Sequence, residues 1–277
     1  MGRVAQPGPG GVPGWRVLTA PAAPSIPSRV RTGRPHTGSL RDLVDADKRG
    51  AVGAFADALN NGPGCYHRLD FGEGLVVNGI FDIEKYLDRY HLPEDLRGVS
   101  VLDVGTASGY FALECATRGA EVTAIDVWDA LPIVDVLGPA RTGIRYLRRD
   151  LYPLDEGFGT YDLVICGSLL LHLPDPLGAV RKLRQACRGR AIISTAATEE
   201  SATDGRRRCV FVGEQVPGTE YWTYWALSAA ALTRMCEVAG FSSVDHVEHF
   251  ALVPEPGTVP EPGATLGVPH LALTATV

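Results

Sequence analysis

The chain has 277 residues, of which 45% are hydrophobic, and a formal net charge of −6. That length and apolar content suffice for one sizeable buried core with extensions, and the acidic balance disfavours the broad basic surface of a nucleic-acid-binding protein. The six cysteines include no CxxC pair and no Cys/His cluster, so neither a zinc site nor a disulfide scaffold is predicted. No apolar run is long enough to span a membrane, and we expect a cytoplasmic protein without a membrane segment.

The part of the chain before residue 98 divides into a tail and a more regular segment. Residues 1–38 contain seven prolines, seven glycines and five arginines but no acidic residue, and this composition predicts disorder. Ser39 begins an amphipathic pattern that predicts one helix up to Leu59, and a short helix is predicted over 82–90. We therefore expect three parts: a disordered tail over 1–38, a helix and lid segment over 39–97, and the main domain over 98–277.

Residues 99–126 are the most informative stretch. Val99–Val104 is a short apolar run between two glycines, which predicts a buried parallel strand. Gly105–Gly109 then supplies a tight turn into a helical run that Gly119 ends. A second predicted strand finishes at Asp126. Strand, glycine turn, helix, strand and acid form the first half of a nucleotide-binding βαβ unit, in which the backbone approaches the ligand and the acid accepts ribose hydroxyls.

The glycine spacing distinguishes between candidate nucleotides. A dinucleotide site uses G-x-G-x-x-G, which lets a pyrophosphate lie against the helix N-terminus. Here the spacing is G-x-x-x-G, and Asp103 precedes it at the strand end. A carboxylate there repels a pyrophosphate but suits an ammonium group, while Asp126 suits a ribose. S-adenosylmethionine carries both groups and an adenine, so it is the predicted cofactor; a structural turn without a ligand is the alternative.

The rest of the chain continues the alternation of strands and helices. Strands are predicted over 144–147, 161–166, 190–195, 244–253 and 268–277, and helices over 130–137, 177–187 and 229–239. The last two strands suit an antiparallel hairpin that closes a sheet. Residues 198–223 show no clear period and are predicted to form a variable lid.

The glycine turn and its following acid resemble the first motif of class I S-adenosylmethionine-dependent methyltransferases. This resemblance implies an α/β, Rossmann-like fold: a seven-stranded, mostly parallel sheet with an antiparallel last strand, plus an N-terminal helical and lid extension. It also implies that Asp150 accepts the adenine amine and that the backbone amide of Leu151 meets a ring nitrogen. Val127 is expected either beside the adenine or in ordinary surface packing, and Gly167 at the crevice where the strands end. The predicted cofactor-binding residues are Asp103, Gly105, Thr106, Gly109, Asp126, Val127, Asp150, Leu151 and Gly167.

A narrower resemblance covers residues 66–241. Tyr66-His67, followed by Gly79, is similar to the element that precedes the core of the wobble-uridine tRNA-modifying methyltransferases and their uncharacterised relatives. In that family the element packs over the cofactor site and helps to enclose the substrate. Its members often carry an acid or a similar polar group at the position of Ser108.

Two histidines are candidates for acid–base catalysis. His172 follows the predicted strand 161–166, where the activated methyl group and its acceptor are expected to meet, and it is placed to take a proton from a hydroxyl or an amine. His67 is the second candidate. The alternatives are structural, with His172 shaping the pocket and His67 bound to backbone in a loop. No metal is implied, because no carboxylate/histidine cluster has ligand spacing.

Four aromatic residues are candidates for contact with the acceptor, or equally for packing: Tyr66, Tyr221, Trp222 and Trp225. We predict an S-adenosylmethionine-dependent methyltransferase that acts on a small-molecule acceptor, by O- or N-methylation in specialised metabolism. One alternative is a tRNA- or RNA-modifying methyl- or carboxymethyltransferase, which the acidic balance disfavours. The other is a non-catalytic cofactor-binding module, against which the intact cofactor residues argue.

Overall fold

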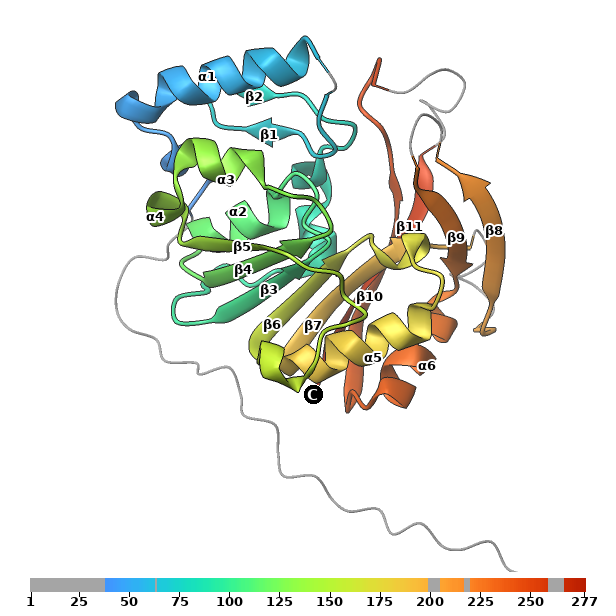
Figure 1. Cartoon of the computed structure of the whole chain (residues 1–277). Helices are drawn as coiled ribbons and strands as arrows, with labels where there is room; N and C mark the ends of the chain where they lie inside the picture. The colour runs from blue at the N-terminus through green and yellow to red at the C-terminus, as the bar shows by residue number, and fades with distance from the viewer. Residues whose placement is uncertain (1–37, 63, 199–204, 217–219, 259–266) are drawn as a thin grey trace, which may run out of the picture.

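The computed structural model of the protein describes residues 38–62, 64–198, 205–216, 220–258 and 267–277. A seven-stranded sheet in the order β10-β11-β7-β6-β3-β4-β5 lies at its centre (Figure 1). The strands are β3 (Ser100–Val104), β4 (Glu121–Asp126), β5 (Ile144–Arg148), β6 (Tyr161–Gly167), β7 (Cys187–Ala196), β10 (Ser243–Leu252) and β11 (Val268–Thr276). Strands β3 to β7 are parallel, and β11 is antiparallel to both its neighbours, β7 and β10. The predicted Rossmann-like sheet with an antiparallel last strand is confirmed.

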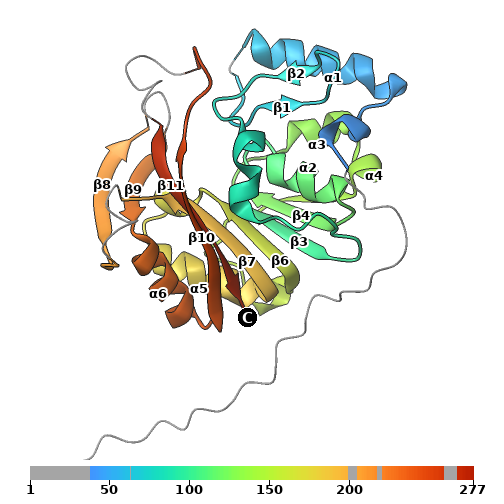
Figure 2. The same cartoon turned by 180° about the vertical axis from the view of Figure 1, so that it is seen from behind.

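Helices cover both faces of this sheet (Figures 1 and 2). The α-helices are α1 (Ala46–Asn60), α2 (Tyr110–Thr117), α3 (Pro132–Leu137), α4 (Pro139–Thr142), α5 (Pro176–Ala186) and α6 (Ala229–Ala239). Alternate residues of β3 point to opposite faces: Val101 packs with α2 and α3, whereas Leu102 and Val104 pack with α5 and α6. Because both faces are buried, β3 is a continuous apolar run in the sequence rather than an alternating one. The short α4 was not predicted.

The N-terminal segment packs on the same face of the sheet as α2. It contains the 3-10 helices η1 (Leu40–Leu43) and η2 (Ile83–Tyr90), α1, and the strand pair β1 (Leu69–Asp70) and β2 (Val76–Val77). The single helix predicted from Ser39 was wrong, because Val44 is extended and Asp45 starts a new helix by accepting the N–H of Lys48 at 3.2 Å. Apolar side chains of this segment join those of α2 and the sheet in one buried cluster. The predicted tail over 1–38 lies, except for Gly38, outside the described residues.

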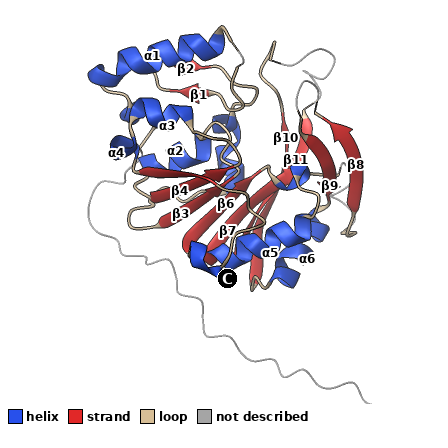
Figure 3. Cartoon of the chain, viewed as in Figure 1, coloured by secondary structure: helices blue, strands red, loops and turns tan. Residues whose placement is uncertain are grey.

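A β-hairpin occupies part of the variable lid predicted over 198–223. Strand β8 (Cys209–Gln215) pairs antiparallel with β9 (Trp222–Leu227) and forms a separate small sheet beside the β10/β11 end of the molecule (Figure 3). Phe211 on β8 is 64% exposed. With little burial on either face, β8 has no alternating pattern that would reveal a strand in the sequence.

Within these described ranges, no helix combines the length and the apolar character that crossing a membrane requires.

Candidate active site

A cavity of about 550 Å³ opens at the carboxyl ends of β3, β4 and β6. We call it the inner cavity. Open α/β sheets bind their ligands at this edge, and small-ligand sites have volumes of about 300–1,000 Å³. The predicted site residues in its wall are Tyr66, Gly105, Asp126, Val127, Asp150, Leu151, Gly167, His172 and Tyr221.

The turn after β3 holds the Asp126 carboxylate in the wall of the inner cavity. Gly105 has φ +71°, and a Cβ there would lie 2.9 Å from the side chain of Leu169, so this position requires glycine. The N–H of Ala107 donates to Asp126 Oδ2 at 2.9 Å, and the N–H of Val127 donates to Oδ1 at 2.7 Å. The two oxygens of a carboxylate together accept about four hydrogen bonds, so this group can accept a further donor. Burial raises the pKa of Asp126.

Asp103 lies behind the cavity wall and does not line the cavity. It is 1% exposed, and its Oδ2 accepts the hydroxyl proton of Thr106 at 2.7 Å. Burial raises the pKa of Asp103 to about 7. Thr106 is also buried, and Gly109 is the N-cap of α2. The Asp103 carboxylate supports the turn through Thr106, and its contact with a ligand ammonium group stays a prediction.

Asp150 and Leu151 follow β5 at the other end of the inner cavity. Asp150 Oδ1 accepts the N–H of Tyr152 at 3.0 Å, and Oδ2 has no hydrogen-bond partner among the described residues. Leu151 is buried. Val127 and Trp128 are about half exposed beside them, at 49% and 53%. This end of the cavity therefore offers an acceptor carboxylate beside apolar surface, which suits a purine base.

His172 ends the 3-10 helix η4 (Leu170–His172) just after β6 and lines the inner cavity. Its Nδ1 lies 2.9 Å from the carbonyl oxygen of Trp222 on β9. A carbonyl oxygen only accepts hydrogen bonds, so Nδ1 carries the proton and Nε2 keeps a free lone pair. Burial lowers the pKa of His172, which keeps the ring neutral near pH 7.

The other histidine candidate, His67, is buried away from the cavity. Only 3% of it is exposed, and its ring contacts those of Tyr66, Tyr110 and Phe111. Burial lowers the pKa of His67 to about 3, and its Nδ1 has no hydrogen-bond partner among the described residues. This position favours a structural role for His67 over a catalytic one.

The predicted aromatic residues separate into two groups. Tyr66 and Tyr221 line the inner cavity, but Trp222 and Trp225 do not. Trp225 packs against Phe211 of β8 and donates its Nε1–H to the carbonyl of Pro174 at 3.2 Å. Trp222 reaches the site only through its backbone carbonyl, which orients His172. Trp225 thus attaches the hairpin to the loop before α5, and contact of either tryptophan with the acceptor stays a prediction.

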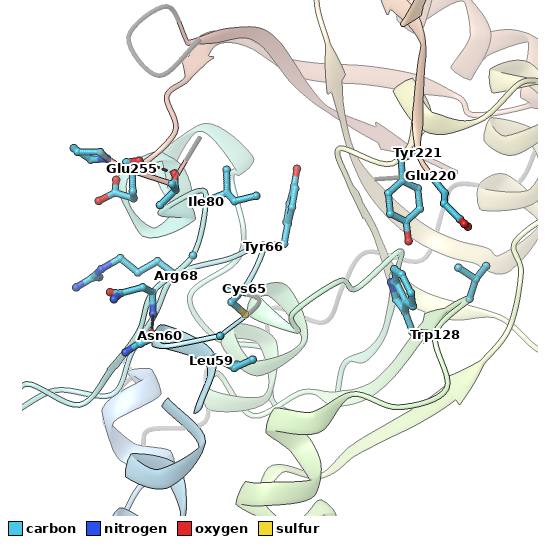
Figure 4. A pocket seen from close by; sticks show the side chains of 18 of the residues that line it. Leu59, Asn60, Cys65, Tyr66, Arg68, Ile80, Trp128, Glu220, Tyr221 and Glu255 are labelled. Carbon is cyan, nitrogen blue, oxygen red and sulfur yellow. Dashed lines mark hydrogen bonds between the residues drawn. The ribbon is translucent and has the colours of Figure 1, made fainter. Parts of the chain in front are cut away.

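A second cavity, of about 1530 Å³, adjoins the first. Figure 4 shows this outer cavity, with Tyr66 and the N-terminal segment on one wall and Trp128, Glu220 and Tyr221 on the facing wall. Tyr66, Val127, Trp128 and Tyr221 line both cavities, so these four residues mark the border between them. No group of three or more His, Cys, Asp or Glu side chains with metal-binding geometry occurs among the residues that the structure describes.

A family model described as a methyltransferase domain matches residues 81–246, which is more than half of the chain. The chain belongs to this methyltransferase domain family. It is a class I S-adenosylmethionine-dependent methyltransferase, and S-adenosylmethionine is its cofactor. The narrower resemblance to wobble-uridine tRNA-modifying enzymes is not confirmed, because the family model describes only the domain and the relatives below carry other names.

Curated relatives of this methyltransferase match over part of their length. A ubiquinone biosynthesis O-methyltransferase from Vibrio parahaemolyticus is 37% identical over 91 residues, which cover 32% of this chain and 39% of the relative. The protein of the same name from Pseudomonas paraeruginosa is 33% identical over 105 residues, covering 36% and 45%. This chain therefore spans less than half of each relative.

A solved structure shares the fold of the methyltransferase. The N-terminal domain of EvdMO1 with SAH bound superimposes with a TM-score of 0.57 and 17% identity, covering 83% of this chain and 97% of that domain. At this identity the likeness extends to the fold alone.

The wall of the inner cavity matches the chemistry of the cofactor. Asp126 and Asp150 offer carboxylate acceptors in this wall, and the volume lies in the range of small-ligand sites. Sequence reasoning did not select several further wall residues: Val104, Ala107, Ile125, Arg149, Tyr152, Ser168, Leu169, Leu173 and Pro174. Their common signal is closeness to the end of a strand or to η4, which marks the rim of a parallel sheet.

Proposed function

We propose that this methyltransferase transfers a methyl group to a hydroxyl oxygen of a small-molecule acceptor in the outer cavity, with His172 as the general base. The observation that carries the proposal is the tautomer of His172. The Trp222 carbonyl holds the proton on Nδ1, and the unprotonated Nε2 belongs to a residue that lines the inner cavity close to the border. Oxygen is favoured over nitrogen because a hydroxyl must lose its proton during attack, whereas a neutral amine attacks without a base.

The residues of the chain have distinct proposed roles. Asp126 accepts the ribose hydroxyls, Asp150 the adenine amine, and Val127 packs beside the base. S-adenosylmethionine supplies an electrophilic methyl group and leaves as a neutral thioether. As the oxygen–carbon bond forms, His172 Nε2 takes the hydroxyl proton. Tyr66 and Tyr221 enclose the border between the cavities, and this holds the acceptor in line and excludes water.

The charges of the outer cavity support a small-molecule acceptor. Arg68 pairs with Asp70 at 2.9 Å, Arg148 pairs with Asp129, and Glu220 and Glu255 also line the wall. This mixture of charges does not form the basic channel that an RNA backbone requires. A gel-shift assay with bulk tRNA at low salt separates the two acceptor classes: we expect no shift, and a salt-sensitive shift would favour the RNA alternative.

The names of the curated relatives support oxygen as the acceptor atom, because both are O-methyltransferases. The place of the acceptor in specialised metabolism stays a prediction. A panel of phenols, catechols, sugars and amines, assayed with methyl-labelled S-adenosylmethionine, tests the acceptor class. We expect label on at least one hydroxyl compound; label on amines alone would contradict the proposal.

Replacing the base tests its role with the best acceptor from that panel. His172→Ala should lower kcat by about 10²–10⁴-fold, the usual contribution of a general base. Cofactor affinity should change by less than about twofold, since His172 is not among the residues proposed to hold the nucleoside. His246→Ala, at an exposed histidine of β10, serves as the matched control. Unchanged turnover in His172→Ala would make this residue a part of the pocket wall only.

The pH dependence of the wild-type enzyme gives an independent measure. The neutral form of His172 is the active one, so kcat/KM should fall as pH drops through its pKa, by about tenfold for each pH unit. Burial lowers the pKa of His172, so the acidic limb should lie below the ordinary histidine value of about 6.5. An inflection at or above that value would contradict the assignment.

A further inference from the structure

The segment around Tyr66 is held between two parts of the chain. On one side it pairs with residues 80 and 81: Phe81 donates its N–H to the carbonyl of Tyr66 at 3.0 Å, and Arg68 donates to the carbonyl of Phe81 at 2.8 Å. Gly79 lies so close that a Cβ there would be 2.1 Å from the carbonyl carbon of His67. The segment therefore has no room to move toward this side.

On its other side the backbone of the segment donates hydrogen bonds to one hydroxyl group. Ser108 Oγ accepts the N–H of Tyr66 at 3.0 Å and the N–H of His67 at 3.1 Å. A hydroxyl oxygen has two lone pairs, and both are used here. One side chain thus satisfies two successive backbone donors of the wall that carries Tyr66.

Ser108 itself belongs to the turn that holds Asp126. It lies between Ala107, whose N–H binds Asp126, and Gly109, the N-cap of α2 with φ +88°. Ala107 has φ +48°, a left-handed conformation that is unfavourable for a residue with a side chain. Ser108 therefore joins this turn to the backbone of the Tyr66 segment by hydrogen bonds, beside the ring contacts of His67 with Tyr110 and Phe111.

We propose that Ser108 is a positioning residue that fixes Tyr66 at the border between the two cavities and couples cofactor binding to the order of the acceptor wall. The proposal rests on the assignment of the inner cavity to the cofactor and the outer cavity to the acceptor. Ser108 contacts neither ligand in this role and acts through the backbone of residues 66 and 67.

Amide hydrogen exchange at Tyr66 and His67, followed by NMR with and without S-adenosylhomocysteine, tests this coupling. In the wild type we expect the ligand to slow exchange at both amides by about tenfold or more. Ser108→Ala should speed their exchange in the free protein and remove the effect of the ligand on them. The amides of residues 105–107 should still be protected by ligand in that variant. Ser108→Thr, which keeps the hydroxyl, should restore the wild-type behaviour.

A control variant and a ligand-binding measurement separate failure of the Ser108 proposal from failure of the cofactor assignment. Ser242→Ala is the control, because it removes a hydroxyl that donates to the Thr276 carbonyl at 3.2 Å, outside both cavity walls. Unprotected amides at Tyr66 and His67 in the wild type, or equal ligand protection in Ser108→Ala, would overturn the proposal. Failure to bind S-adenosylhomocysteine would instead count against the cofactor site, and the exchange of the free protein would still test the Ser108 contact.

Discussion

The two ends of the central sheet carry carboxylates in opposite electrostatic situations. At the amino end, Asp162 of β6 accepts the N–H of Ser100 at 3.0 Å and its hydroxyl at 2.8 Å. Arg188 of β7 also donates to both carboxylate oxygens at 2.8 Å. The Arg188 guanidinium holds the pKa of Asp162 down, at about 2. This acid is fully paired and joins three neighbouring strands.

At the carboxyl end, the acids have hydrogen bonds but no cation. Burial raises the pKa of Asp103 to about 7, and the charge of Asp126 adds to the effect. Burial also raises the pKa of Asp126. No salt bridge among the described residues involves either acid. The comparison shows that Asp162 has a cationic partner within the fold, whereas Asp103 and Asp126 have none among the described residues; burying these two acids without a cation costs stability in the free protein.

The largest expected effect is the loss of cofactor binding in Asp126→Ala. Hydrogen bonds to a charged group contribute about 1.5–3 kcal/mol each, so losing two ribose contacts should weaken S-adenosylmethionine binding by about 100-fold or more. Isothermal titration measures the change, with Asp162→Asn as a variant that should bind normally. A further titration with NAD should give no binding. Tight NAD binding without S-adenosylmethionine binding would contradict the cofactor assignment made for this wall.

The next effect concerns the paired acid at the amino end. Asp162→Asn should lower the free energy of unfolding by about 1–2 kcal/mol, because hydrogen bonds to Ser100 and Arg188 are lost. In the wild type the stabilisation from Asp162 is present above its unfolded pKa, near 4, and is lost as pH falls toward about 2. Urea unfolding between pH 2 and 6 measures both quantities. If the free energy of unfolding of the variant fell equally steeply between pH 6 and pH 2, Asp162 would not be the source of the acid sensitivity.

The smallest effect is expected for Asp103→Asn. Near pH 5 the buried carboxyl of Asp103 is protonated in the folded state, so a neutral amide of similar shape should change the free energy of unfolding by less than about 1 kcal/mol. As pH rises from about 4 to about 7, the unfolded chain loses this proton first, so the wild type loses stability relative to the variant. Thermal unfolding at pH 5 and pH 8 measures this change. If the variant instead lost more stability than the wild type between pH 5 and pH 8, Asp103 would be charged and paired in the folded protein.

The sequence predicts the fold well and selects several residues that line the inner cavity, because both depend on local patterns. The apolar run before Gly105, the glycines and the acid at Asp126 follow directly from the geometry of a βαβ unit. Asp150, which the sequence also predicts as a cofactor-binding residue, lies in the wall of the inner cavity. Gly105, Asp126 and Asp150 each lie at or just after the end of a strand, so their position at the edge of the sheet depends on chain order and not on distant contacts.

Features that depend on tertiary context were not predictable in the same way. Asp103 alternates with Val104 along β3, so it points to the α2 face, and the period of two in a strand places it behind the wall. Strand β8 of the hairpin is largely exposed and lacks a periodic signal. The orientation of His172 depends on a backbone carbonyl of Trp222, 50 residues away, which no side-chain pattern encodes.

A crystal structure of the wild-type enzyme with S-adenosylhomocysteine tests the central assignment most directly. The account predicts the nucleoside in the inner cavity, with the ribose hydroxyls within hydrogen-bond distance of Asp126, the adenine beside Asp150, and the sulfur facing the border at Tyr66 and His172. A nucleoside outside this cavity, or one whose ribose makes no contact with Asp126, would contradict it.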